Sequence, residues 1–124
     1  MSAQERVRFP RSVYGIGDDP DPRFSLANER TFLAWISTGL GLLAAGVALE
    51  TFAIDLQPAL RLAASILLIV AGIATPIQAW LGWMRTERAM RLSLPLPSPR
   101  LALPLVIIIA VAGALVIAAT VLAR

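Results

Sequence analysis

Three long apolar runs dominate this sequence, at residues 32–49, 62–84 and 101–122. A helix needs about 20 apolar residues to cross the hydrocarbon core of a bilayer, and the first run reaches that length when it continues to Ile54. Hydrophobic residues make up 57% of the chain and charged residues only 15%, which leaves too little polar surface to cover a soluble core. The sequence therefore predicts an all-α integral membrane protein with three transmembrane helices, at about residues 32–54, 62–84 and 101–122.

The residues before the first run divide into a tail and a helix start. Apolar residues within residues 1–20 show no persistent period, so we expect a flexible cytoplasmic tail there. Asp21 and Pro22 predict the start of a helix, because Asp caps free backbone N–H groups and Pro fits the first helical position. Residues 21–124 are then expected to form one transmembrane module.

The arginines predict the orientation of this module in the plasma membrane. Five lie before the first run, four lie between the second and third runs, and Arg61 and Arg124 are the two others. Basic flanks stay on the cytoplasmic side, so we expect the N-terminus in the cytoplasm and the C-terminus outside. The nine arginines expected inside are Arg6, Arg8, Arg11, Arg23, Arg30, Arg85, Arg88, Arg91 and Arg100.

Composition argues against several kinds of catalytic site. The chain contains no Cys and no His, and every basic residue is Arg. It therefore lacks the usual nucleophile and base pairs, the thiolate and imidazole metal ligands, and a lysine for Schiff-base chemistry. We expect a non-enzymatic protein without catalytic residues, metal or cofactor. The net charge of +3 is explained by membrane topology, so no nucleic-acid partner is expected.

One face of the first run carries only small side chains at Ser37, Gly41, Ala45 and Ala48. Small residues allow helix backbones to approach closely in a bilayer, where lipid supplies no hydrophobic drive for association. This face is predicted to pack against another helix, and we expect a homo-oligomer.

Polar and basic residues gather at the predicted cytoplasmic ends of the first two spans. Arginine presents a planar fork of donors that matches phosphate, so these ends are candidates for binding an anion or a lipid headgroup. The candidate residues are Arg23, Asn28, Arg30, Arg85, Arg88 and Arg91. The alternative is that they are ordinary topology signals held by Glu–Arg pairs within the chain.

Further polar residues lie along the first two spans and form the candidate structural motif. They either make hydrogen bonds between helices or line a path for ions or solutes. These residues are Glu29, Thr31, Trp35, Thr38, Thr75 and Gln78.

Two stretches, LANERTFLAWISTGL and WMRTERAMRLSLPLP, resemble the YidH-like family of small membrane proteins (domain of unknown function 202). The same module is similar to the transmembrane part of vacuolar transporter chaperone proteins. The resemblance implies a three-helix membrane module that self-assembles and handles polyphosphate or other anions. Relatives commonly have Arg after the Trp-Ile pair, where this chain has Ser37. The motif positions are Asn28, Glu29, Arg30, Thr31, Trp35, Thr38, Arg85, Arg88 and Arg91.

Two functional hypotheses follow. In the first, the protein self-associates in the plasma membrane and presents a basic cytoplasmic rim to polyphosphate, anionic lipid or a protein partner. In the second, an oligomer forms an anion or polyphosphate pore lined by Asn28, Arg30, Thr38, Thr75 and Arg85. A pore requires Thr38 and Thr75 to meet water, whereas a scaffold buries them.

Overall fold

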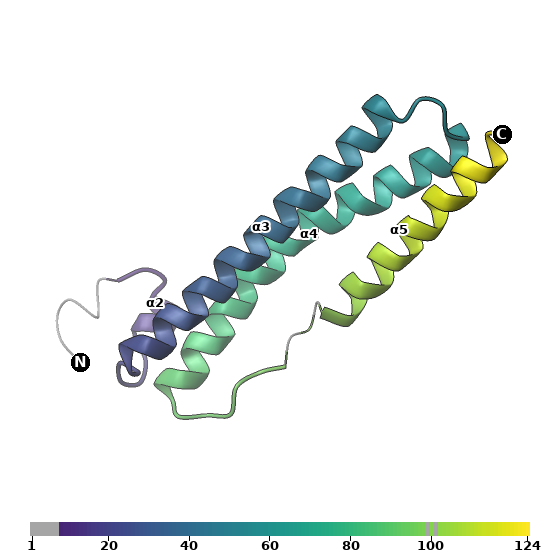
Figure 1. Cartoon of the computed structure of the whole chain (residues 1–124). Helices are drawn as coiled ribbons and strands as arrows, with labels where there is room; N and C mark the ends of the chain where they lie inside the picture. Colours follow the sequence, from purple (N-terminus) through teal and green to yellow (C-terminus); the bar gives the residue numbers. More distant parts are fainter. Residues whose placement is uncertain (1–7, 99, 101) are drawn as a thin grey trace. The chain divides into compact units, whose positions relative to one another are not determined.

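The computed structural model describes residues 8–98, 100 and 102–124 (Figure 1). In this part of the chain all regular structure is helical, in α2 (Arg11–Tyr14), α3 (Pro22–Phe52), α4 (Pro58–Arg91) and α5 (Ala102–Leu122). Helices α3, α4 and α5 are long and apolar enough to cross a membrane. The predicted all-α fold with three transmembrane helices is therefore confirmed. Leu101, where the third predicted span begins, lies outside the described residues.

Helix α3 begins at the predicted Asp21–Pro22 position. The backbone N–H of Arg23 donates to Asp21 Oδ1 at 2.9 Å, and the N–H of Phe24 donates to the Asp21 carbonyl at 2.9 Å. The side chain of Arg23, and secondarily its backbone N–H, lowers the pKa of the Asp21 carboxyl from its usual value. Asp21 therefore stays ionised at the positive end of the helix dipole, where a negative charge is favourable.

Helix α4 has a cap at each end. At its start, Gln57 Oε1 accepts a hydrogen bond of 2.8 Å from the N–H of Leu60, and Pro58 occupies the first helical position. At its end, Ser93 adopts a left-handed conformation with φ of 56°. The N–H of Leu94 then returns to the carbonyl of Ala89 at 2.8 Å, which satisfies an end carbonyl of the helix.

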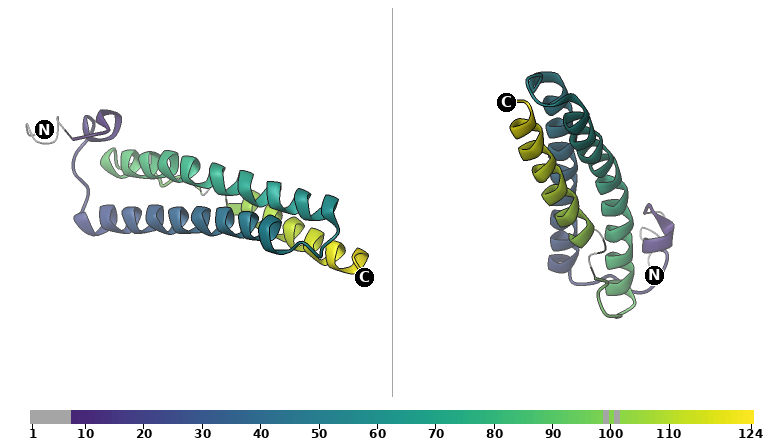
Figure 2. Two further views of the ribbon diagram at one scale, coloured as in Figure 1. Left: turned by 90° about the horizontal axis from the view of Figure 1, so that it is seen from above. Right: turned by 90° about the vertical axis from the view of Figure 1, so that its right-hand side faces the viewer.

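The chain divides into two compact units. Unit 1 consists of Met1–Ala34 and Gln78–Pro99, and unit 2 of Trp35–Ile77 and Arg100–Arg124. In unit 2, segments of α3, α4 and α5 pack together, as Figure 2 shows from two directions. The packing has a small apolar centre, contributed by all three helices: Leu42, Ala71 and Leu105, with Trp35, Leu68 and Ile108 packed against them.

Glycines bring α3 and α4 close together in unit 2. A Cβ added to Gly39 would lie 3.1 Å from Pro76 Cδ, and one added to Gly46 would lie 2.6 Å from Ile69 Cγ1. On the opposite helix, a Cβ on Gly72 would lie 2.7 Å from Leu43 Cγ. The glycines thus let α3 and α4 approach closely, and close approach of this kind stabilises helix pairs in lipid.

The predicted small face of α3 does not form this contact. Ser37, Gly41, Ala45 and Ala48 are all exposed, and a Cβ on Gly41 would meet no atom within 4 Å. Packing between helices of the same chain therefore uses the glycines of another face. Contact of the predicted small face with a second copy of the chain stays a prediction.

Helix α5 also packs through small residues. Its buried positions are Leu105, Ala112 and Ala119, which recur every seven residues and so lie on one side of the helix. The carbonyl of Ala119 accepts a hydrogen bond of 3.1 Å from the N–H of Gln57 in the preceding connection. This bond ties the end of α5 to the turn between α3 and α4 in unit 2.

Candidate functional site

Unit 1 pairs the first turns of α3 with the last turns of α4. Asn28 Nδ2 donates to the carbonyl of Trp83 at 3.1 Å and to Glu87 Oε1 at 3.3 Å. Ser25 Oγ donates to Glu87 Oε2 at 3.2 Å, and the rings of Phe32 and Trp80 meet edge to face. Residues earlier in α3 lie opposite residues later in α4, so these two segments run antiparallel.

The segment before α3 packs against the end of α4 (Figure 2). The Arg91 side chain is 1% exposed and donates to the Asp19 carboxylate at 2.6 Å and to the carbonyls of Ile16 and Tyr14 at 2.8 and 3.2 Å. The N–H of Asp18 returns a bond of 3.2 Å to the carbonyl of Arg91. Residues 8–20 of the predicted flexible tail therefore make defined contacts, and residues 1–7 lie outside the described residues.

Aromatic rings surround the same part of α4. Trp80 and Trp83 stack with ring centroids 5.2 Å apart, Phe9 stacks on Trp80, and Tyr14 tilts against Trp83. The guanidinium of Arg8 lies 4.4 Å from the centre of the Tyr14 ring. Burial, and secondarily the negative charge of Glu87, raises the pKa of the Tyr14 hydroxyl.

Four of the six residues predicted to bind phosphate already form hydrogen bonds or ion pairs with other groups of the chain. Arg23 pairs with Asp21 at 2.8 Å, and Arg88 Nη1 donates to the carbonyl of Ser12 at 2.5 Å. Asn28 and Arg91 make the contacts described above. Asn28 uses Glu87 and a backbone carbonyl as acceptors, whereas Arg23, Arg88 and Arg91 use aspartates and backbone carbonyls. Among the described residues these three arginines form no Glu–Arg pair, which is the contact that the sequence offered as an alternative.

Arg30 and Arg85 are the other two candidates. Arg30 is exposed, and Arg85 is partly buried with its Nε atom buried and without a hydrogen-bond partner in the described part of the chain. Since Ser25 lies opposite Glu87 and Phe32 opposite Trp80, Arg30 is at the level of residue 82. The two arginines thus differ by three residues along the helix pair, or roughly 4.5 Å.

The remaining motif residues are not gathered at one place. In unit 1, Glu29 and Thr31 are exposed and Gln78 is partly buried. In unit 2, Trp35 packs against the apolar centre and Thr38 is exposed. Thr75 is fully buried, and its Oγ1 donates to the carbonyl of Ala71 at 2.6 Å, one turn back along its own helix.

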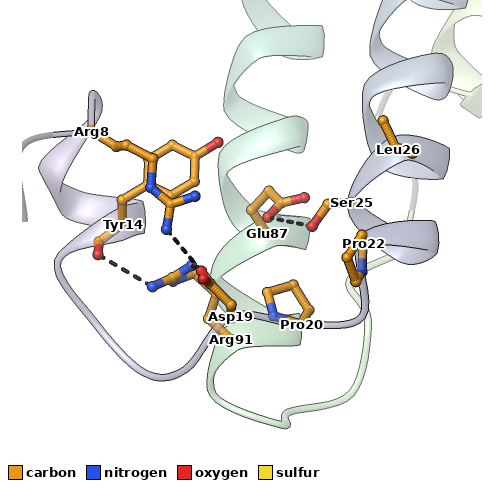
Figure 3. A pocket seen from close by; sticks show the side chains of 9 residues that line it. All are labelled: Arg8, Tyr14, Asp19, Pro20, Pro22, Ser25, Leu26, Glu87 and Arg91. Carbon is orange, nitrogen blue, oxygen red and sulfur yellow. Dashed lines mark hydrogen bonds and ion pairs between the residues drawn. The ribbon is translucent and has the colours of Figure 1, made fainter. Parts of the chain in front are cut away.

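A cavity of about 300 Å³ lies between the N-terminal segment and the two helices of unit 1 (Figure 3). Its polar lining includes residues that were not among the sequence-based candidates, such as Tyr14, Asp19, Ser25 and Glu87. Tyr14 and Asp19 have no helical periodicity around them, so the sequence carried no signal that they meet α4. The full lining consists of Arg8, Tyr14, Asp19, Pro20, Pro22, Ser25, Leu26, Glu87 and Arg91.

Comparison with known proteins supports the family resemblance. A family model described as "Domain of unknown function (DUF202)" matches residues 23–89. Inner membrane protein YidH of Escherichia coli strain K12 is 51% identical over 78 residues, covering 62% of this chain and 68% of YidH. An uncharacterised protein of Mycobacterium tuberculosis strain H37Rv is 46% identical over 104 residues, covering 83% and 85%. No solved structure matches the chain at a significant level.

The matched region contains the first quoted motif, the second motif up to residue 89, the Asn28–Glu87 contact and all three glycines that bring α3 and α4 together. The chain therefore belongs to the DUF202 family, and with its three membrane-spanning helices it is a small multi-pass protein of the inner membrane.

Proposed function

We propose that this protein is a non-enzymatic membrane scaffold that binds phosphate-bearing groups at a basic rim formed by Arg30 and Arg85. The observation that carries the proposal is the buried Nε atom of Arg85, which has no hydrogen-bond partner among the described residues. A buried N–H without a partner is costly, and a phosphate oxygen is a strong acceptor for guanidinium. Because the Arg85 side chain is only partly buried, an anion that binds its accessible part offsets some of that cost.

The depth of the two arginines supports an anionic lipid headgroup as the ligand. Arg30 lies two residues before the apolar run of α3, and Arg85 directly follows the apolar run of α4. Both therefore fall where a transmembrane helix meets the headgroup layer, on the side that the arginine distribution predicts to be cytoplasmic. Basic residues at this level attract the anionic lipids of the cytoplasmic leaflet.

The pore hypothesis has less support than the scaffold hypothesis. A pore requires the Thr75 hydroxyl to meet water, but Thr75 is fully buried and bonded to its own helix. A Cβ on Gly39 of α3 would come within 3.5 Å of Thr75 Cβ, so the facing helix covers this side chain. The packing of unit 2 therefore favours dry burial of Thr75.

The lipid proposal predicts site-specific loss of anionic lipid. In nanodiscs of phosphatidylcholine and phosphatidylglycerol, native mass spectrometry should show phosphatidylglycerol retained by the wild-type protein. Arg30→Gln and Arg85→Gln should each reduce that retention about fivefold, because a basic residue near an anionic surface contributes about 1 kcal/mol. Raising the salt concentration should reduce the retention by the wild-type protein as well.

Arg23→Gln is the matched control for this measurement. It makes the same change in net charge on α3, but the guanidinium of Arg23 is already paired with Asp21. We expect its effect on retention to be less than twofold, because Asp21 already compensates the charge of Arg23. An equal loss in all three variants would mean that general surface charge, and not a site at Arg30 and Arg85, holds the lipid.

Self-association through Ser37, Gly41, Ala45 and Ala48 is the second part of the proposal. These residues are exposed in unit 2, and small residues are poor partners for lipid tails but good partners for a second helix. Gly41→Leu should therefore abolish the oligomer detected by chemical crosslinking of the protein in nanodiscs. Gly113→Leu on α5 is the control, since a Cβ there also meets no atom within 4 Å. An oligomer unchanged by Gly41→Leu would assign the contact to another face.

A further inference from the structure

The cavity of unit 1 contains a buried carboxylate whose partners carry no charge. Glu87 is 2% exposed, and its side chain lines the cavity together with that of Ser25 (Figure 3). Its two oxygens accept one hydrogen bond each, at 3.2 Å from Ser25 Oγ and 3.3 Å from Asn28 Nδ2. Both donors are neutral, so they hold the carboxylate in place without balancing its charge.

The neighbouring arginines are directed to other acceptors. Arg88 donates to the carbonyl of Ser12, and Arg91 donates to Asp19, Tyr14 and Ile16. Arg8 pairs with Asp19 at 2.8 Å. Within the described residues, Glu87 therefore forms no ion pair. An ionised carboxylate removed from water is stabilised strongly by a cation beside it, and a ligand in the cavity can supply that cation.

We propose that this cavity binds a primary ammonium group carried on a short alkyl stem. A primary ammonium has three N–H donors, and the cavity is lined by the two carboxylate oxygens of Glu87 and the hydroxyl oxygen of Ser25. The ring of Tyr14 also forms part of the wall, and the guanidiniums of Arg8 and Arg91 lie 4.4 and 5.5 Å from the centre of this ring. A carboxylate without an ion pair among the described residues, beside a hydroxyl acceptor in the same cavity, suits an ammonium better than a neutral ligand.

The apolar part of the lining fits the stem of such a ligand. Pro20, Pro22 and Leu26 line the cavity beside the start of α3 and present carbon surfaces to a methylene chain (Figure 3). A volume of about 300 Å³ is at the small end of ligand pockets, which suits a headgroup-sized molecule. No group of three or more acidic side chains in the described part of the chain is placed to hold a metal ion, which disfavours a metal cation.

Two kinds of molecule carry a primary ammonium group on a short alkyl stem. One is the ethanolamine headgroup of a membrane lipid, since the α3 residues that line the cavity lie six to ten residues before the apolar run and thus near the headgroup layer. The other is a soluble amine such as ethanolamine or spermidine. The site is separate from the rim of Arg30 and Arg85, because neither of these residues lines the cavity.

The wild-type protein tests the ligand class directly. Nanodiscs containing equal amounts of phosphatidylethanolamine, its N-methyl and N,N-dimethyl derivatives and phosphatidylcholine would be compared by native mass spectrometry. Retention should fall at each methylation step, because each step removes one N–H donor and the last leaves none. In nanodiscs of phosphatidylcholine alone, isothermal titration with ethanolamine and with spermidine tests the soluble source.

Variants then locate the site. Glu87→Gln should weaken ammonium binding by roughly tenfold or more, as expected for the loss of a hydrogen bond to a charged group. Glu29→Gln is the matched control, since Glu29 is an exposed carboxylate of the same unit that does not line the cavity. The Glu29→Gln variant should bind the ammonium ligand with an affinity within twofold of the wild-type value.

The outcomes separate the possibilities. Preference for phosphatidylethanolamine that is lost in Glu87→Gln supports the lipid source, and binding only of free amines with the same loss supports the soluble source. Equal retention of all four lipids together with no heat of amine binding overturns the proposal, and this result needs no variant to fold. The proposal is also overturned if the Glu87→Gln variant remains folded and binds the ammonium ligand as tightly as the wild-type protein.

Discussion

Replacing Gly46 with leucine is expected to separate α3 from α4 in unit 2 and to lower the free energy of unfolding by about 3 kcal/mol. A Cβ at this position would lie 2.6 Å from Ile69 Cγ1 and 2.9 Å from the carbonyl oxygen of Ser65. Neither atom is the free end of a flexible side chain. The clash can therefore be relieved only by moving the helix backbones apart.

Helix propensity opposes this effect but is too small to reverse it. Leucine is a better helix former than glycine by at most about 1 kcal/mol, and this gain applies wherever the substitution is made. At Gly46 the cost of overpacking exceeds the gain. At Gly113, where a Cβ meets no atom within 4 Å, the gain acts alone. Gly113→Leu should therefore leave the unfolding free energy unchanged or slightly higher.

Titration with sodium dodecyl sulfate, followed by tryptophan fluorescence, measures the difference between these variants. Trp35 packs against the apolar centre of unit 2, so its emission reports separation of the helices there. The chain has no native Cys, so cysteines introduced on α3 and α4 can confirm the separation by disulfide trapping. Equal midpoints for Gly46→Leu and Gly113→Leu would contradict the close glycine packing.

The sequence predicted the number and class of the helices because the length of an apolar run is a direct requirement of the bilayer. It also located the start of α3, since Asp21 and Pro22 act locally. It did not distinguish Gly39 and Gly46, which pack inside the chain, from Gly41, which does not. In a soluble helix polarity marks the outer face, but lipid is as apolar as the protein interior and leaves no such mark.

The candidate site was predictable only in part for a different reason. Asn28 and Glu87 both belong to the quoted motifs, but they are 59 positions apart, and their contact depends on the register between two helices. The partners of Arg91 were not predictable, because two of its acceptors are the backbone carbonyls of Tyr14 and Ile16. Every residue has a carbonyl, so an acceptor of this kind leaves no signal in the sequence.

Replacing Arg91 with leucine is expected to release the N-terminal segment of unit 1 from α4. The guanidinium donates three hydrogen bonds to this segment while its side chain is 1% exposed. Hydrogen bonds to a charged group contribute about 1.5–3 kcal/mol each and do not add fully, so we expect a loss of about 3 kcal/mol. Asp19 keeps its pair with Arg8, so the substitution leaves no unpaired carboxylate. The effect is therefore loss of docking, without a stranded charge.

Hydrogen exchange of the peptide that contains Asp18 measures this release, because the N–H of Asp18 donates to the Arg91 carbonyl at 3.2 Å only while the segment is docked. A loss of about 3 kcal/mol corresponds to exchange roughly 100-fold faster. Arg88→Leu is the control, three residues earlier on α4, where an exposed guanidinium makes one bond to the Ser12 carbonyl. We expect less than tenfold acceleration there. Similar acceleration in both variants would show that general positive charge, and not the bonds of Arg91, holds the segment against α4.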